Sequence, residues 1–270
     1  CAILDLFDLF LASHEKSSDD SSAPTANDIC LCALQVTGHG VKKSKKSKPS
    51  RLSAILRRAC SIVERIKNNI DASFLGRNPI IQTLVKRCLK LGLTSLPPSE
   101  YEVGILSLRL LRALVSIPGD GTSDPRAEET SFPPMILKLS TTHSNFASLM
   151  SDQDRTPFEQ RVGVAKLVLC CLLASQKSSL GKKDVEILQL SCRASTSQYD
   201  KVIRSIVDLY DRSSDEGLCL DELIWQDSQP ARLDDGTSQS KWDWLPSSIK
   251  QARVFSTLRC FPSSDGAHPM

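Results

Sequence analysis

The chain contains ten cysteines, which could bind a metal ion or act as nucleophiles. None of them forms a Cys-x-x-Cys pair, and no group of Cys and His residues has the spacing of a zinc site. Most lie among Leu, Ile and Val, as Cys170 and Cys171 do. A buried free thiol behaves as a small apolar side chain. We therefore predict reduced core cysteines and no metal site, rather than the disulfide framework of a small secreted domain.

Other patterns with a known chemistry are also missing. The segment Gly38-His39-Gly40 lacks the rest of a phosphate-binding glycine pattern, and no Gly-x-Ser-x-Gly is present. His143 directly precedes Ser144, but neighbours in sequence do not have the geometry for proton transfer, and no third member is evident. The sequence therefore predicts a protein without catalytic residues, cofactor or small-molecule substrate.

Charge is unevenly distributed along the chain, although the formal net charge is only +3. Residues 41–100 contain fourteen Lys and Arg and three Asp and Glu, whereas residues 205–245 contain ten acids and three basic residues. A basic surface attracts phosphate polyanions through counterion release. We predict RNA contact through Lys42, Lys43, Lys45, Lys46, Lys48, Arg51, Arg57 and Arg58.

The lysine cluster has two other interpretations. Its composition also fits a nuclear-localisation signal, or a solvated Lys/Ser linker without a partner. Three tryptophans lie in the C-terminal quarter, and tryptophan often anchors interfaces. We predict a partner interface at Trp225, Trp242 and Trp244, with a cap over the end of the helical array as the alternative.

Apolar residues recur at steps of three and four from residue 50 to residue 66, which predicts an amphipathic helix. Asn78-Pro79 predicts the start of the next helix, which ends near Gly92. Ser99 and Glu102 have capping-box spacing, and Thr156-Pro157 begins a helix that is apolar nearly all round. We expect that helix, over residues 162–174, to be the most buried element.

The pattern as a whole predicts an all-α fold of seven or eight helices without a strand. Further helices are expected over residues 135–150, 183–192, 198–210 and 218–225, and a flexible basic linker over residues 37–50. Helices that start near residues 50, 99 and 156 recur at about fifty residues, close to the repeat length of HEAT proteins. We predict an irregular HEAT/armadillo-like helical repeat array, and an irregular helical bundle would give the same pattern. The predicted parts are residues 1–49 (short helices and a basic linker), 50–240 (the repeat domain) and 241–270 (a tail with one helix).

Composition excludes a membrane protein at this stage. Apolar residues make up 40% of the 270 residues, and the mean hydropathy is −0.17. The longest nearly uninterrupted apolar stretch, residues 167–174, is far shorter than the ~20 residues of a spanning helix. Because the chain starts at Cys1 rather than Met, we expect a piece of a longer protein or a processed product.

One stretch, residues 188–225, has a pattern beyond simple periodicity. A turn of small residues that contains the adjacent Thr196 and Ser197 precedes an Asp, an apolar helix that ends in Tyr, and a Leu-rich segment that ends in Trp. This pattern resembles the C-terminal helical region of the nucleolar pre-ribosomal-associated proteins, which are scaffolds of early large-subunit precursors. The matching residues are Thr196, Ser197, Asp200, Ile203, Leu209, Tyr210, Leu218, Leu220 and Trp225.

The resemblance implies a non-enzymatic α-helical scaffold in the nucleus and nucleolus that acts in early assembly of the large (60S) ribosomal subunit. Its implied partners are pre-rRNA and pre-60S assembly factors, including an RNA helicase, other nucleolar scaffold proteins and snoRNPs. No membrane or small-molecule partner is implied. The alternative from the residues is a helical-repeat adaptor for trafficking or signalling that binds proteins and not RNA.

Overall fold

The structure is a computed structural model that describes residues 25–42, 49–94, 96–117, 132–142 and 158–174, together with Leu245 and Ile249. Within these residues all regular structure is helical and no strand is present. The α-helices are α2 (Ala26–Lys42), α3 (Pro49–Ile66), α4 (Ala72–Arg77), α5 (Pro79–Leu93), α6 (Tyr101–Val115), α8 (Phe132–Thr142) and α10 (Phe158–Ala174). Short 3₁₀ turns cover Lys67–Asn69 and Pro98–Glu100. The predicted all-α class is confirmed for the described residues.

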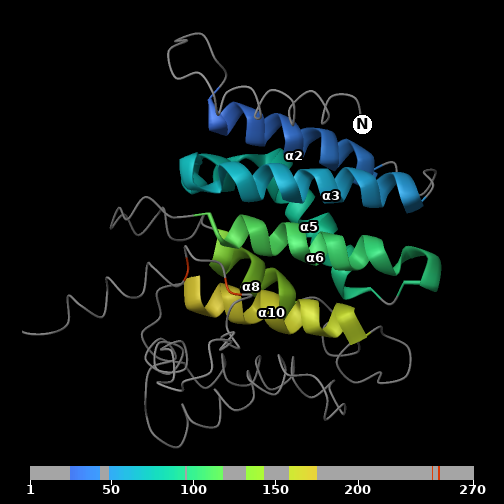
Figure 1. Cartoon of the computed structure of the whole chain (residues 1–270). Coiled ribbons are helices and arrows are strands. Elements are labelled where there is room, and N and C mark those ends of the chain that lie inside the picture. The colour runs from blue at the N-terminus through green and yellow to red at the C-terminus, as the bar shows by residue number, and fades with distance from the viewer. Residues whose placement is uncertain are drawn as a thin grey trace, which may run out of the picture.

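The helices pack side by side in an order that follows the chain (Figure 1). Helix α3 packs against α2 and α6, and α6 packs against α3, α5 and α10. Helix α5 also packs against α2, and α8 packs mainly against α10. Residues 57 and 64 of α3 contact residues 102 and 109 of α6, so these two helices run in the same direction, 45 residues apart.

One continuous apolar core joins the helices. Leu108 of α6 lies between two glycines of neighbouring helices. A Cβ atom added to Gly92 of α5 would lie 2.5 Å from the Cδ2 atom of Leu108, and one added to Gly163 of α10 would lie 3.0 Å from its Cδ1 atom. The missing side chains therefore let α5 and α10 approach α6 closely at this leucine.

Helix α10 is buried nearly all round. Val164, Ala165 and all seven residues from Leu167 to Leu173 are buried. The cause of this burial is the sequence itself, because apolar residues occupy every side of this stretch. The prediction that this helix is the most buried element is not confirmed, because α6 buries ten of its fifteen residues, a comparable share. Leu245 and Ile249, from the predicted C-terminal tail, belong to the same core.

The predicted start of α5 is confirmed. The Oδ1 atom of Asn78 accepts a hydrogen bond of 2.9 Å from the amide of Ile80, and Pro79 occupies the first helical position. This arrangement satisfies one of the amides that a helix leaves unpaired at its first turn.

Two predicted boundaries differ from the structure. The capping box of Ser99 and Glu102 is wrong, because a 3₁₀ turn covers Ser99 and α6 starts at Tyr101 without a side-chain cap. Glu102 is instead paired with Arg57 of α3. Helix α2 extends through residues 37–42, which the sequence predicted as a linker. Its buried Thr37 hydroxyl donates to the carbonyl of Ala33 at 2.8 Å, and Val41 is also buried.

Helix α2 contributes to the core although it belongs to the predicted N-terminal part, since Ile29, Cys30, Ala33 and Leu34 are buried. Helix α8 covers the first part of the helix predicted over residues 135–150 and starts three residues earlier. The helices predicted over residues 183–192, 198–210 and 218–225 lie outside the described residues, as does the stretch that carries the family resemblance.

Candidate interaction surfaces

The basic residues predicted to contact RNA fall into two groups. Arg51, Arg57 and Arg58 lie on α3, where Arg51 and Arg57 are exposed and Arg58 is half-buried. Lys43, Lys45, Lys46 and Lys48 lie outside the described residues, and Lys42 is the last residue of α2. The structure therefore places three of the eight predicted side chains, all on one helix.

Two ion pairs connect α3 to α6, one heptad apart and with the charges exchanged. Arg57 of α3 pairs with Glu102 of α6. Arg109 of α6 donates to both carboxylate oxygens of Glu64 of α3, from Nε at 3.1 Å and from Nη2 at 3.0 Å. The hydrogen bond to Glu64 raises the pKa of Arg109 above its usual value. Because these side chains are partly exposed, each pair contributes about 0.2–1 kcal/mol.

A row of three arginines runs along α3. Arg51, Arg58 and Arg65 are separated by seven residues, or about two turns, so they lie along one side of the helix about 10 Å apart. Arg65 of α3 and Arg109 and Arg112 of α6 are not among the residues predicted to contact RNA. The signal that could have found them is the same spacing of three and four that predicted the helices.

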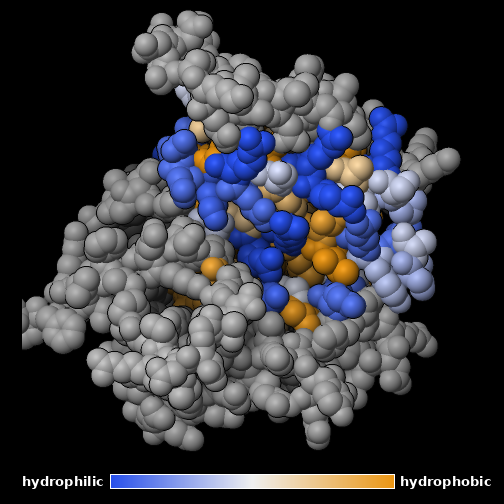
Figure 2. Space-filling model, in the orientation of Figure 1, coloured by the Kyte–Doolittle hydropathy of each residue, from blue (hydrophilic) through white to orange (hydrophobic). Residues whose placement is uncertain are grey.

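We name this surface the arginine face. Its members are Arg51, Arg57, Arg58, Arg65, Arg109 and Arg112, with Glu64 and Glu102 as the acids among them. Figure 2 shows hydrophilic residues gathered over α3 and α6 in the same orientation as Figure 1. Counted over the described residues, these six guanidinium groups and two carboxylates have a summed formal charge of +4.

A second basic row lies on α5. Lys86 and Lys90 are exposed, and Arg87 is half-buried with its Nη1 atom 3.3 Å from the carbonyl oxygen of Gly38. No acidic residue occurs in α5. These residues belong to the basic region 41–100 but are not among those predicted to contact RNA.

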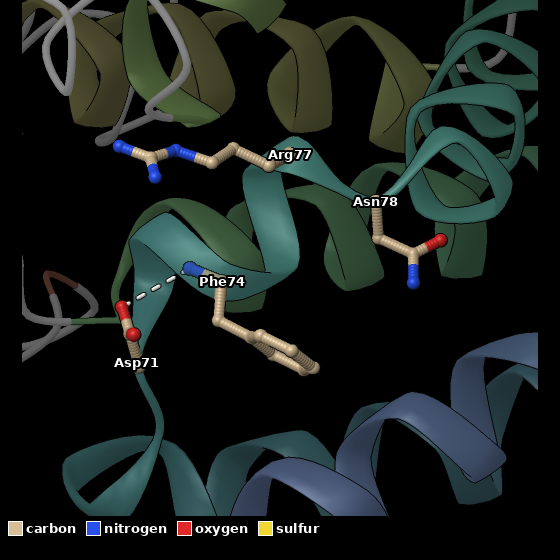
Figure 3. A pocket seen from close by; sticks show the side chains of 4 residues that line it. All are labelled: Asp71, Phe74, Arg77 and Asn78. Carbon is tan, nitrogen blue, oxygen red and sulfur yellow. Dashed lines mark hydrogen bonds between the residues drawn. The ribbon is translucent and has the colours of Figure 1, made fainter.

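An open depression of about 370 Å³ lies at the junction of α4 and α5. Asp71, Phe74, Arg77 and Asn78 line it (Figure 3). The ring of Phe74 and the side chain of Asn78 point to the same side of α4, whereas Arg77 extends in another direction. The Oδ1 atom of Asp71 accepts a hydrogen bond of 3.1 Å from the amide of Phe74.

The described cysteines are free thiols, and all but Cys32 are buried. Burial raises the pKa of the Cys30, Cys60, Cys88 and Cys170 thiols to about 12 and that of Cys171 well above its usual value. The predicted core placement is confirmed for these five cysteines. A thiol with so high a pKa is a poor nucleophile and metal ligand.

Other features of the described residues bear on function. They contain no group of three His, Cys, Asp or Glu side chains that could hold a metal ion. None of the helices found in these residues has the length and apolar content needed to cross a membrane. The predicted partner interface at Trp225, Trp242 and Trp244 lies outside the described residues.

Comparison with known proteins gives no match. No protein-family model matches the chain. No curated protein and no solved structure matches it either.

Proposed function

We propose that this chain is a non-enzymatic helical-repeat scaffold of early nucleolar assembly of the large ribosomal subunit. It contacts pre-rRNA phosphates through the arginine face and holds assembly factors on its other surfaces. Support comes from the all-helical packing of the described residues, from the charge of the arginine face, and from the sequence resemblance of residues 188–225.

The packing order supports a HEAT/armadillo-like repeat. We interpret α2 with α3, α5 with α6, and α8 with α10 as three successive helix pairs, because α3, α6 and α10 contact one another in that order. The offset is 45 residues between α3 and α6 and 55 residues between Leu108 of α6 and Gly163 of α10. Stacked helix pairs of this kind present extended surfaces that suit large partners.

The arginine face is the observation that carries the RNA contact. Guanidinium groups are planar and always charged, and they bind phosphate oxygens through paired hydrogen bonds. Neutralising a phosphate releases counterions, so such contacts make affinity strongly dependent on salt. Because the charges lie on packed helices, they are presented in a fixed arrangement.

Base stacking contributes little to this contact. Helices α3 and α6 together contain one aromatic residue, Tyr101, which is half-buried at the start of α6. Proteins that read single-stranded bases stack them on several aromatic side chains. We therefore expect recognition of the phosphate backbone without strong sequence preference.

Binding of the full chain to a 20-base-pair RNA duplex, measured by fluorescence anisotropy between 50 and 200 mM KCl, tests the proposal. The R51E/R58E double variant should bind about tenfold more weakly at 50 mM KCl and show a shallower salt dependence, because fewer counterions are released. The E64Q/E102Q double variant should bind several-fold more tightly, since it removes the two carboxylates that neutralise Arg57 and Arg109. If both double variants bound the duplex with the same affinity as the wild type, the arginine face would have no role in RNA binding.

In cells, crosslinking of the intact parent protein should recover pre-rRNA and small nucleolar RNAs.

The competing function is a protein-binding adaptor without RNA contact, and one observation favours it. Arg57 and Arg109 are paired with glutamates and so offer less charge to an RNA. Recovery of proteins without any pre-rRNA would support the adaptor.

A further inference from the structure

The junction of α4 and α5 exposes two large apolar side chains. Phe74 of α4 is 45% exposed and Ile80 of α5 is 48% exposed, and they are the large apolar side chains most accessible to solvent in the described residues. They are six residues apart. Phe74 lines the depression together with Asp71, Arg77 and Asn78 (Figure 3), and Ile80 follows two residues after Asn78 in the chain. Exposed aromatic and aliphatic side chains beside a depression are typical anchors of protein interfaces.

Local hydrogen bonds hold this junction in place. The Asp71 carboxylate accepts from the amide of Phe74, and the Asn78 side chain accepts from the amide of Ile80. The amide of Asp71 donates in turn to the side-chain oxygen of Asn27 at the start of α2, at 2.8 Å. Both apolar residues are therefore carried on backbone that is fixed in orientation, so a partner would find the surface already formed.

The surface next to these apolar side chains is basic. On α5, Ile80, Thr83, Arg87 and Lys90 follow one another at steps of three and four, so they form one stripe about 15 Å long, in which Arg87 is half-buried and the other three are exposed. Lys86 is exposed beside this stripe. Because α5 contains no acidic residue, its charge is not compensated within the helix.

From this arrangement we infer that the stripe binds an acidic amphipathic segment of a partner protein. The apolar anchor of that segment packs against Phe74 and Ile80. Its carboxylates pair with Lys86 and Lys90, which are four residues apart and therefore lie on neighbouring turns of one helix face. A partner helix with Asp or Glu at the same spacing matches them.

The separation of apolar side chains from basic side chains favours a peptide over a nucleic acid as the partner. The apolar end and the cationic end of the stripe are separate, as are the apolar and acidic residues of an amphipathic segment. A phosphate backbone carries charge at every nucleotide and would leave Phe74 and Ile80 without an apolar partner. Ile80 also cannot stack on a base. This inference does not rest on the RNA role of the arginine face, which lies on α3 and α6.

Selection from a random 12-residue peptide library on the immobilised full chain tests the inference. The enriched peptides should share at least two Asp or Glu residues and one large apolar residue. A synthetic peptide of the enriched sequence should bind the F74S variant at least tenfold more weakly and the K86E/K90E variant about tenfold more weakly. The R51E variant is the matched control, because Arg51 is an exposed basic residue on a different helix, and it should bind normally.

Thermal unfolding should show that each variant stays folded, since all the substituted side chains are at least 45% exposed or lie on an exposed face. Enrichment of no acidic–apolar consensus would overturn the inference, as would equal binding of the peptide to wild type, F74S and K86E/K90E. Displacement of the peptide by the 20-base-pair RNA duplex, with RNA affinity lost in K86E/K90E, would assign the stripe to nucleic acid instead. Loss of RNA binding in R51E/R58E alone would leave the inference standing.

Discussion

Gln160 of α10 holds the end of α5 against the rest of the fold, and its replacement by methionine should destabilise the protein. The side chain is fully buried. Its Nε2 atom donates to the carbonyl oxygens of Gly92 at 2.6 Å and Thr94 at 2.9 Å, at the C-terminal end of α5. The last carbonyl groups of a helix have no partner within the helix, so a side chain from a neighbouring helix supplies the donor.

The size of the effect follows from these bonds. Each contributes about 0.5–1.5 kcal/mol net, and a buried acceptor left unpaired costs about 1–3 kcal/mol. Within the described part of the chain, the Oε1 atom of Gln160 has no hydrogen-bond partner, so its removal offsets about 1 kcal/mol of the loss. We expect Q160M, which conserves volume, to lower the free energy of unfolding by about 2–3 kcal/mol.

Urea unfolding of the full chain, followed by circular dichroism, measures this difference. Q82M is the matched control. Gln82 is half-buried and its Nε2 atom donates once, to the carbonyl oxygen of Gly76 at 2.9 Å, so its replacement should cost about 0.5–1 kcal/mol. A loss in Q160M of less than about 0.5 kcal/mol, or no larger than in Q82M, would contradict the role assigned to these hydrogen bonds.

The Q160E variant adds a dependence on pH. Its carboxyl group keeps the shape of the side chain but is buried, and burial raises the pKa of a carboxyl above its unfolded value of about 4.3. A raised folded pKa gives stability that is present below about pH 4.3 and is lost as the pH rises through the folded pKa. Relative to wild type, Q160E should therefore lose stability from pH 4.5 to pH 8. A difference that does not vary with pH would refute the reasoning.

Two further predictions follow from close packing and from burial. G92A should lower the free energy of unfolding by about 1–2 kcal/mol, because the added methyl group would lie 2.5 Å from Leu108. G38A should raise the free energy of unfolding by about 0.5–1 kcal/mol, because nothing lies within 4 Å of the added group and alanine favours a helix. Urea unfolding checks both, and a stabilised G92A would contradict the packing. In native protein at pH 8, maleimide should modify Cys32 quickly and Cys88 only after unfolding, because a pKa of about 12 leaves roughly one thiol in ten thousand ionised. Peptide mapping by mass spectrometry measures each rate, and equal rates would refute the burial of Cys88.

Features that depend on a few neighbouring residues could be predicted from the amino-acid sequence. Asn78 and Pro79 fix the start of α5, because a cap and a proline act within one helical turn. The apolar run of α10 makes it buried, because no side of it is polar. The core placement of Cys170 and Cys171 follows from the same run.

Contacts between residues far apart in the chain depend instead on how the helices pack. Ser99 and Glu102 have the spacing of a capping box, yet Glu102 pairs with Arg57, because the parallel packing of α3 and α6 brings residues 45 positions apart into contact. Exposure of Phe74 and Ile80 likewise depends on the angle between α4 and α5, which the local periodicity of apolar residues does not specify. Helix formation is encoded in short-range spacing, whereas helix register and surface exposure depend on packing across the whole core, where a donor such as Gln160 meets carbonyls more than sixty residues away.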